Sequence, residues 1–214
     1  MESVAPKKRR HRLLSLDLIL DTAIGLARAN GLAGVSMPSV SRSLGTTPMS
    51  LYKHVENKEA LVRQMLDRAT GMVNSPARQD DPAEEVMTAF EAVHEMLRRD
   101  PWTVEHFLTG YRGAEPVREL VSRSLTALNG LGLERSDAWQ AYQALLRYTY
   151  GEALAAAASV QGSLRYDDID DGPTEADETI REFKEAVPAG QSGERYRETL
   201  HRYLRSILAE VGSG

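Results

Sequence analysis

Cysteine and long apolar stretches are both absent from the 214-residue chain. Without cysteine there is no disulfide framework and no cysteine-ligated zinc site. No uncharged stretch approaches the roughly 18 apolar residues that a membrane-spanning helix needs. A basic stretch before Leu13 has the charge of a secretory signal, but Asp17 and Asp21 interrupt the apolar run behind it and no small-residue cleavage site follows. We therefore expect a cytoplasmic protein without a membrane partner.

The motifs of common enzymes are also missing. The chain contains no Gly-x-Ser-x-Gly elbow, no Gly-x-x-x-x-Gly-Lys loop, no Gly-x-Gly-x-x-Gly turn and no His-Glu-x-x-His pair. His94, His106 and Glu152 carry side chains that bind metals, but they lack the tight spacing of a metal site. We expect no catalytic residue, no metal and no resident cofactor.

Charge is divided unevenly along the chain, whose net charge is −5. Residues 1–68 carry 11 Lys and Arg against 6 Asp and Glu, a net charge of +5, and the remainder carries 15 against 25, a net charge of −10. Affinity for DNA follows the local field, which salt screens within about 8 Å under physiological conditions. A basic segment followed by an acidic body therefore favours a directed contact with nucleic acid.

Four helices are predicted in the basic segment, over residues 16–30, 37–44, 48–55 and about 58–72. The first has apolar residues at helical spacing, and the fourth continues the apolar stripe. Residue types that cap, start or stop helices stand at the limits of all four. These signals are Ser15, Asn30-Gly31, Ser36, Pro38, Gly45, Thr47-Pro48 and Asn57.

The third predicted helix is too short to be stable alone, so it makes sense as an element presented by a scaffold to a partner. Leu51 and Val55 lie four residues apart and must point inward, which leaves polar and basic side chains on the outer faces. The major groove of DNA fits this pattern best. The residues expected to contact DNA are Ser36, Thr46, Thr47, Pro48, Met49, Ser50, Tyr52, Lys53, His54 and Lys58.

Three spaced runs in this segment carry a family resemblance. They are Leu44-Gly45, Leu51-Tyr52-Lys53-His54-Val55 and Asn57-Lys58-Glu59-Ala60-Leu61. Residues 17–66 thereby resemble the DNA-binding domain of the tetracycline-repressor-like (TetR/AcrR) transcription factors. Pro38 departs from the pattern, because many members carry an arginine there that contacts DNA. The resemblance implies a homodimer that binds a near-palindromic operator and leaves it when a small molecule occupies the C-terminal domain.

The basic run from Lys7 to Arg12 precedes the first helix. By itself it is equally typical of a solvated tail. Beside a helix-turn-helix it favours an arm that contacts phosphates or the minor groove. We therefore predict a helix-turn-helix DNA-binding domain with a basic N-terminal arm over residues 1–72.

The remaining residues, 73–214, read as an α-helical ligand-binding and dimerisation domain, which makes the predicted fold all-α. No alternation typical of strands occurs. An acidic loop is expected over residues 162–177. Helices are expected near residues 83–99, 101–108, 116–128, 136–161, 175–186 and 194–210.

The last predicted helix has a narrow apolar stripe with near-heptad spacing. Its members are Tyr196, Leu200, Tyr203, Ile207 and Val211. Ordinary packing within one domain explains this spacing equally well. The family resemblance implies that residues 136–161 and 194–210 form a four-helix bundle with a second subunit, and a two-fold pair also doubles the length of DNA that is read.

Aromatic residues gather in the middle of the body, with a few polar groups between them. The aromatic residues are Trp102, Phe107, Tyr111, Trp139, Tyr142, Tyr148 and Tyr150, and the polar ones are His94, His106, Arg147 and Glu152. A small-molecule pocket has this composition, although aromatics at helical spacing also form plain core. The best candidates for ligand contacts are Trp102, His106, Trp139 and Tyr142.

These observations predict a sequence-specific DNA-binding transcriptional regulator. Its partners would be a double-stranded palindromic operator, a second copy of the chain and a small-molecule effector that releases a repressor. A ligand-independent DNA-binding regulator or architectural protein is the alternative. A helix-turn-helix domain that binds a partner protein fits less well, because the outer face of this domain is basic and polar instead of apolar.

Overall fold

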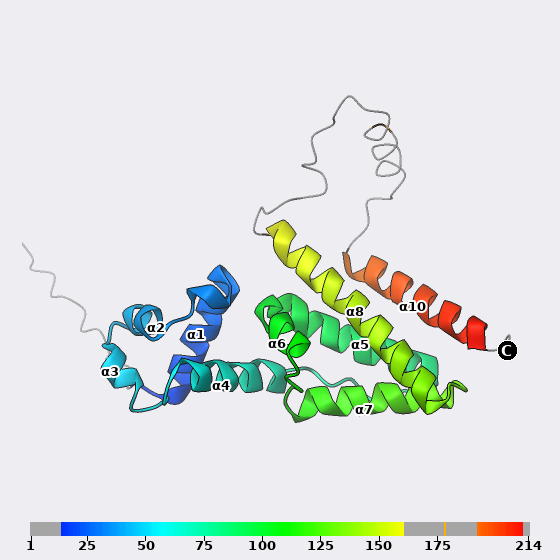
Figure 1. The fold of residues 1–214 in the computed structure, drawn as a ribbon, viewed down its shortest axis with the longest axis horizontal. Helices are drawn as coiled ribbons and strands as arrows, with labels where there is room; N and C mark the ends of the chain where they lie inside the picture. Colours follow the sequence, from blue (N-terminus) through cyan, green and yellow to red (C-terminus); the bar gives the residue numbers. More distant parts are fainter. Residues whose placement is uncertain (1–13, 161–177, 179–191, 212–214) are drawn as a thin grey trace, which may run out of the picture. The chain divides into compact units, whose positions relative to one another are not determined.

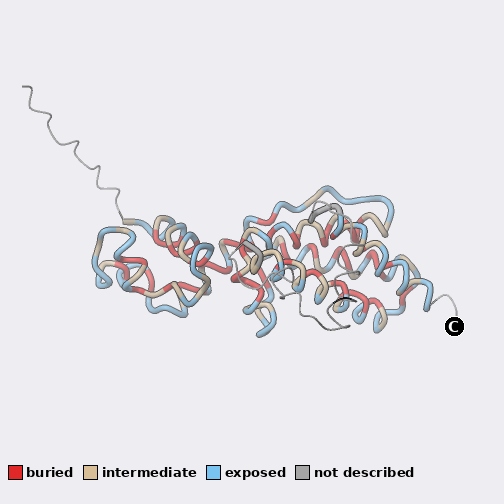
Figure 2. Tube along the Cα trace, turned by 90° about the horizontal axis from the view of Figure 1, so that it is seen from above, coloured by how far each residue is buried: buried red, intermediate tan, exposed pale blue. Residues whose placement is uncertain are grey.

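The computed structural model describes residues 14–160, 178 and 192–211, and within these the regular structure is helical, with no strand. The expected all-α fold is confirmed. The chain divides into two compact units, Met1–Met65 and Leu66–Gly214. In each unit the buried positions lie where helices pack on one another (Figures 1 and 2). The basic run 7–12, the acidic loop 162–177 and most of the helix predicted at 175–186 lie outside the described residues.

The first unit contains short helices, and most of their limits follow the predicted signals. The hydroxyl of Ser15 accepts from the N–H of Leu18 at 3.3 Å, and Gly31 has a φ of 66° just after the first helix. Ala60 donates to Asn57 Oδ1 at 2.9 Å, as expected of a cap. The elements are α1 (Leu16–Asn30), η1 (Leu32–Gly34), α2 (Met37–Leu44), α3 (Pro48–Leu51) and the start of α4 (Lys58–Gly71).

The third helix is shorter than predicted. α3 ends at Leu51, and Tyr52, Lys53 and His54 form a turn instead of a further helical stretch. The backbone N–H groups of His54 and Val55 both donate to the carbonyl of Leu51, at 2.8 and 3.0 Å, which tightens the chain after a single turn. Helices of this length gain little from internal hydrogen bonds, so packing decides where they end.

The second unit is built around α5. This helix contacts α7, α8 and α10, and its residues Val86, Phe90 and Leu97 are buried. Figure 1 shows α8 and α10 running alongside each other. The elements are α5 (Pro82–Arg99), η2 (Pro101–Thr103), α6 (Val104–Leu108), α7 (Glu115–Gly130), α8 (Arg135–Val160) and α10 (Ser192–Val211).

The apolar residues of α8 and α10 are not all buried within the unit. On α8, Trp139 and Leu154 are 49% and 46% exposed. On α10 the buried row is Tyr196, Leu200 and Leu204, while Tyr203 is 48% exposed. Residues four apart drift around a helix of about 3.6 residues per turn. Leu204 therefore faces the core of the unit, and Tyr203 of the predicted stripe lies toward the surface.

A buried ion pair holds the segment between α4 and α5. Arg123 donates through Nε to Glu85 Oε1 at 2.5 Å and through Nη1 to the carbonyl of Pro76 at 2.8 Å. Glu85 also accepts from the N–H of Gln79 at 2.8 Å. The hydrogen bond from Arg123 keeps the pKa of Glu85 below its usual value, so the carboxylate stays charged. The linker is thus fixed to both α5 and α7.

Candidate DNA-binding face and ligand cavity

A left-handed glycine makes the sharp turn between α2 and α3. Gly45 has φ 65° and ψ 34°, and its N–H donates to the carbonyl of Arg42 at 3.1 Å. The next residue, Thr46, donates to the carbonyl of Ser41 at 2.9 Å. These two bonds satisfy carbonyls at the end of α2 and direct the chain at once into α3. The result is the compact geometry of a helix-turn-helix.

The short third helix rests on two buried side chains. Leu51 is fully buried and Val55 is 2% exposed, which confirms that both point inward. The residues expected to contact DNA lie at or near the surface around this scaffold. Thr47, Pro48, Met49, Tyr52, Lys53, His54 and Lys58 are exposed, and Ser36, Thr46 and Ser50 are half-buried.

The hydroxyl groups at the helix starts differ in their use. Ser36 caps α2 as predicted: its Oγ accepts from the N–H of Ser39 at 3.1 Å, and Ser39 Oγ accepts from the N–H of Ser36 at 2.9 Å. Thr47 does not cap α3 through its side chain, because its hydroxyl lies 3.1 Å from that of Ser50. The two hydroxyls satisfy each other at the surface of α3.

A cavity of about 790 Å³ lies in the second unit between α6, α7 and α8. Trp139 and Tyr142, two of the predicted ligand residues, line it. Their rings stack with centroids 5.9 Å apart. Three further aromatic residues of the predicted group also line it, namely Phe107, Tyr111 and Tyr150. The wall is therefore largely aromatic and aliphatic, as in small-molecule sites.

Trp102 and His106, the other two predicted ligand residues, do not line this cavity. Trp102 is 7% exposed, and its indole N–H donates to Asp100 Oδ1 at 3.1 Å. Asp100 is fully buried and also accepts from Arg99 Nε at 2.7 Å. Trp102 therefore serves to satisfy a buried carboxylate. His106 Nε2 is buried and has no hydrogen-bond partner in the part of the chain that the structure describes.

His94, His106 and Glu152 do not come together as a metal site. Among the described residues, no group of three His, Asp or Glu is placed to hold a metal ion. His94 is buried and stacks on Tyr196, with ring centroids 3.7 Å apart. Burial, and then the charge of Arg98, lower its pKa to about 4, so the ring is neutral at physiological pH.

Sequence reasoning missed the arginines of the cavity. Arg112 stands in the loop between α6 and α7, and Arg118 lies on α7. Arg147 of α8 had been noted only as a polar neighbour of the aromatics. Isolated arginines in a loop and on an exposed helix face give no signal in the sequence. Only the packing of α6, α7 and α8 brings the three to one cavity.

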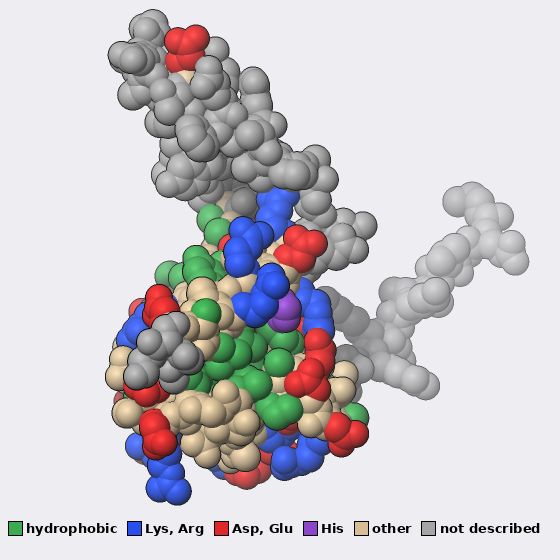
Figure 3. Space-filling model, turned by 90° about the vertical axis from the view of Figure 1, so that its right-hand side faces the viewer, with side chains coloured by type: hydrophobic (Ala, Val, Ile, Leu, Met, Phe, Trp, Pro, Cys, Tyr) green, Lys and Arg blue, Asp and Glu red, His purple; other side chains and the backbone are tan. Residues whose placement is uncertain are grey.

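The outer face of α8 and α10 carries a groove of about 570 Å³. Gln140, Ala144 and Arg147 of α8 and Ile207 of α10 line it. Figure 3 views this unit from its end and shows hydrophobic side chains gathered in the centre, with charged side chains around them. Partly exposed apolar side chains beside small ones are typical of a helix face that packs on another helix.

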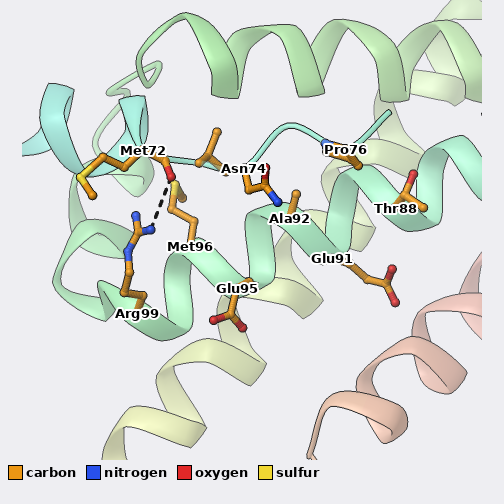
Figure 4. A pocket seen from close by; sticks show the side chains of 10 residues that line it. Met72, Asn74, Pro76, Thr88, Glu91, Ala92, Glu95, Met96 and Arg99 are labelled. Carbon is orange, nitrogen blue, oxygen red and sulfur yellow. Dashed lines mark hydrogen bonds between the residues drawn. The ribbon is translucent and has the colours of Figure 1, made fainter. Parts of the chain in front are cut away.

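A third hollow, of about 300 Å³, lies between α5 and the segment that follows α4 (Figure 4). Met72, Asn74 and Pro76 line it from that segment, and Glu95 and Arg99 line it from α5. The guanidinium of Arg99 is held by the carbonyls of Ala69 at 2.8 Å and Met72 at 3.5 Å. This hollow is smaller and none of the described residues that line it is aromatic, so the aromatic cavity is the better candidate ligand site.

A helix-turn-helix followed by a helical unit with an apolar cavity defines the class of this protein. Residues 19–65 match the family model described as "Bacterial regulatory proteins, tetR family". These residues are therefore similar to the DNA-binding domain of that family, in agreement with the resemblance predicted from the sequence. None of the helices within residues 14–160 and 192–211 combines the length and apolar character that crossing a bilayer requires.

One relative and two solved structures illustrate the likeness. The HTH-type transcriptional repressor DrrR1 of Streptomyces coeruleorubidus is 36% identical over 104 residues, which cover 47% of this chain and 38% of the length of DrrR1. The Streptomyces coelicolor TetR family protein ActR, solved in complex with (S)-DNPA, has a TM-score of 0.66 at 22% identity and covers 94% of this chain and 99% of its own. BioQ of Mycobacterium smegmatis is also similar, and a BioQ structure with its double-stranded DNA operator has a TM-score of 0.57 at 20% identity over 69% of this chain and 89% of that one.

Proposed function

We propose that this chain is a transcriptional repressor that binds a palindromic DNA operator as a homodimer and releases it when a small molecule binds the second unit. Residues 1–72 are assigned to DNA binding and residues 73–214 to ligand binding and dimerisation. The role is one of binding, with no catalytic step. Because chromosomal DNA is its proposed target, we propose a cytoplasmic location for the protein.

The observation that carries the proposal is the exposed set of side chains around α3. Lys53 and His54 stand on the turn directly after the helix, over the buried Leu51 and Val55. Side chains of this kind make hydrogen bonds to base edges, and the exposed N-terminus of α4 with Lys58 suits a phosphate. The match of residues 19–65 to the family model supports the same assignment. The structure described as BioQ with its operator adds an example of DNA binding in a protein of this fold.

A second copy of the chain is the proposed occupant of the α8 and α10 face. One recognition helix reads only a few base pairs, whereas a two-fold pair places two of them in major grooves about 34–36 Å apart. The partly exposed Trp139, Leu154 and Tyr203 would be covered in such a pair. This keeps the two helices that the sequence had assigned to dimerisation.

The aromatic cavity favours a ligand switch over the ligand-independent alternative. Tyr111 lines the cavity, and its hydroxyl donates to Asp67 of α4 at 2.8 Å. In the same loop, the N–H of Ala114 donates to Thr70 Oγ1 of α4 at 2.9 Å. A ligand that displaces Tyr111 would therefore change how the last turn of α4 is held. Because α4 begins in the first unit, this is a route for coupling between ligand and DNA.

Selection of bound sequences from random duplex DNA with the full-length protein tests the proposal. We expect a two-fold symmetric motif with half-sites about one helical turn apart. A variant with both Lys53→Ala and His54→Ala serves as the control and should lose the motif. If the native protein enriches no motif, the selection is repeated after denaturing and refolding, which removes any carried ligand. A second failure would contradict the proposal.

Salt dependence on the selected operator separates phosphate contacts from base contacts. Lys58→Ala should lower affinity for all sequences and reduce the slope of log affinity against log salt by about one unit. Arg98→Ala, at an exposed position on α5 of the second unit, is the matched control. An unchanged slope for Lys58→Ala would remove that residue from the DNA contact.

A further inference from the structure

The charged side chains that line the aromatic cavity are all of one sign. Arg112, Arg118 and Arg147 line it, and no Asp or Glu occurs among the described residues of its wall. The body as a whole is acidic, with a net charge of −10 over residues 69–214. A positive lining in an acidic unit is therefore a local arrangement and does not follow from composition.

Two of the three arginines are available to pair with an anionic ligand. Arg118 is already engaged, because it donates to the carbonyl of Gly113 at 2.7 Å and pairs with Glu115. Arg112 and Arg147 form no ion pair within the part of the chain that the structure describes. A guanidinium presents donors in a planar fork that matches a carboxylate or a similar anion.

The tyrosines of the wall add no negative charge. Burial raises the pKa of Tyr111 and of Tyr150 to about 12, and it raises the pKa of Tyr142 further. All three phenols are therefore protonated at physiological pH and act as neutral donors. The arginines thus dominate the electrostatics of the cavity.

Three aromatic rings of the lining are more buried than its arginines. Tyr142 is buried, and Phe107 and Tyr150 are half-buried, with their ring centroids 6.2 Å apart in a stacked arrangement. Arg112 and Arg147 are exposed, so they stand at the mouth. A ligand that fits has a flat apolar body to lie among the rings and an acidic group at one end.

We infer that the effector of this protein is a planar aromatic anion, with its rings among Phe107, Tyr142 and Tyr150 and its acidic group held by Arg112 and Arg147. The inference rests on the proposed function, because it takes this cavity as the effector site. It adds the chemical class of the ligand and the residues that select it.

Three probes with one ring system and different charges test the inference. They are 9-anthracenecarboxylate, 9-anthracenemethanol and 9-(aminomethyl)anthracene, titrated by fluorescence against the full-length protein. We expect the carboxylate to bind about tenfold or more tightly than the alcohol, because a charge-assisted hydrogen bond is worth more than a neutral one. The amine should bind most weakly.

Variants locate the selectivity within the cavity. Arg147→Gln and Arg112→Gln should each weaken binding of the carboxylate several-fold and leave the alcohol unchanged, while Arg98→Gln on α5 should change neither. Val121→Phe, which fills part of the cavity, should weaken all the probes. Thermal melting of each variant checks that it folds.

Several results would overturn the inference. They are equal or tighter binding of the alcohol or the amine, a carboxylate preference that survives both arginine variants, and no binding of the carboxylate at millimolar concentration. The selection of operator sequences is run on the same protein without any probe. A clear operator with no carboxylate preference would refute the ligand class alone, and a failed selection would refute the proposed function.

Discussion

Gly45 and Gly25 offer opposite tests of the same backbone argument. Gly45 adopts a left-handed conformation with a φ of 65°, which costs other residues about 1–2 kcal/mol. Gly25 lies within α1, is exposed, and a Cβ added there would meet nothing within 4 Å. Gly45→Ala should therefore lower the free energy of unfolding of the first unit by about 1–2 kcal/mol, whereas Gly25→Ala should raise it by about 0.5–1 kcal/mol. Urea unfolding of both variants measures this.

Gly45 is also a position where the sequence was sufficient. A glycine after Leu44, followed by the helix-start signal Thr47-Pro48, is a strong stop signal. The structure has the expected turn there. Equal effects of Gly45→Ala and Gly25→Ala would contradict the assigned turn.

His94 predicts a loss of stability in mild acid. Its pKa is about 4 in the folded protein against 6.5 for the ordinary side chain, because burial disfavours the charged ring. The folded state binds fewer protons, so the contribution of His94 is complete above about pH 6.5 and declines as the pH falls toward 4. Between pH 7 and 5 the loss should be about 2 kcal/mol.

His94→Phe is the control, because a phenyl ring can keep the stack on Tyr196 without titrating. Its free energy of unfolding, measured by urea at both pH values, should fall by about 2 kcal/mol less than that of the native protein. The same pH dependence in both proteins would show that His94 is not held neutral.

The linker before α5 depends on one buried ion pair between two helices. Arg123→Met would leave Glu85 charged and buried without its partner, at a cost of about 3–5 kcal/mol. Replacing both residues, Glu85→Leu with Arg123→Met, removes the unpaired charge and should cost less than the single change. The exposed pair Arg78 and Glu119, 3.7 Å apart, is the control, and Arg78→Met should cost about 1 kcal/mol or less.

Urea unfolding of these variants decides the point. If the double variant were less stable than Arg123→Met alone, the pair would not be acting through buried charge. In that case the hydrogen bond from the N–H of Gln79 to Glu85 would account for the difference, because both variants lack Arg123.

Helix positions in this protein follow from the sequence more closely than helix faces do. The predicted limits of α5, α7 and α8 differ from the observed ones by one or two residues, because prolines and glycines mark their ends. The exposed position of Trp139 was not predictable, because helical spacing alone does not show which face of α8 is covered by other helices. Trp102 was misplaced for the converse reason: the buried Asp100 that it satisfies is two residues away, and a sequence does not show that a carboxylate is buried.

The arrangement of the proposed DNA-binding face was more predictable than that of the proposed ligand cavity. The residues around α3 come from one short run, in which two buried positions set the orientation of the rest. The cavity draws its wall from α6, α7, α8 and the loop that carries Arg112. Its composition therefore depends on how distant segments pack, which helical periods do not specify.

The cavity and the proposed dimer face share one wall. Trp139, Gln143 and Arg147 stand at successive fourth positions of α8, and each of them lines both the cavity and the groove beside α10. Trp139→Ala should therefore weaken both self-association and binding of 9-anthracenecarboxylate, each by more than about 1 kcal/mol. Tyr150→Ala should weaken only the probe, and Tyr203→Ala only the dimer.

Sedimentation equilibrium measures the dimer and fluorescence titration measures the probe. A Trp139→Ala variant that lost one property and kept the other would show that the two sites are separate. The same outcome would remove α8 as a direct connection between ligand and subunit partner.

The most direct test of a ligand-controlled repressor measures operator affinity while the cavity is filled with a ligand. A labelled duplex carrying the selected operator is held by the full-length protein and titrated with 9-anthracenecarboxylate, while fluorescence anisotropy reports bound DNA. We expect release of the operator, with a midpoint that follows binding of the probe and shifts to higher concentration in Arg147→Gln. Operator affinity that stays the same at a probe concentration that saturates the cavity would contradict it.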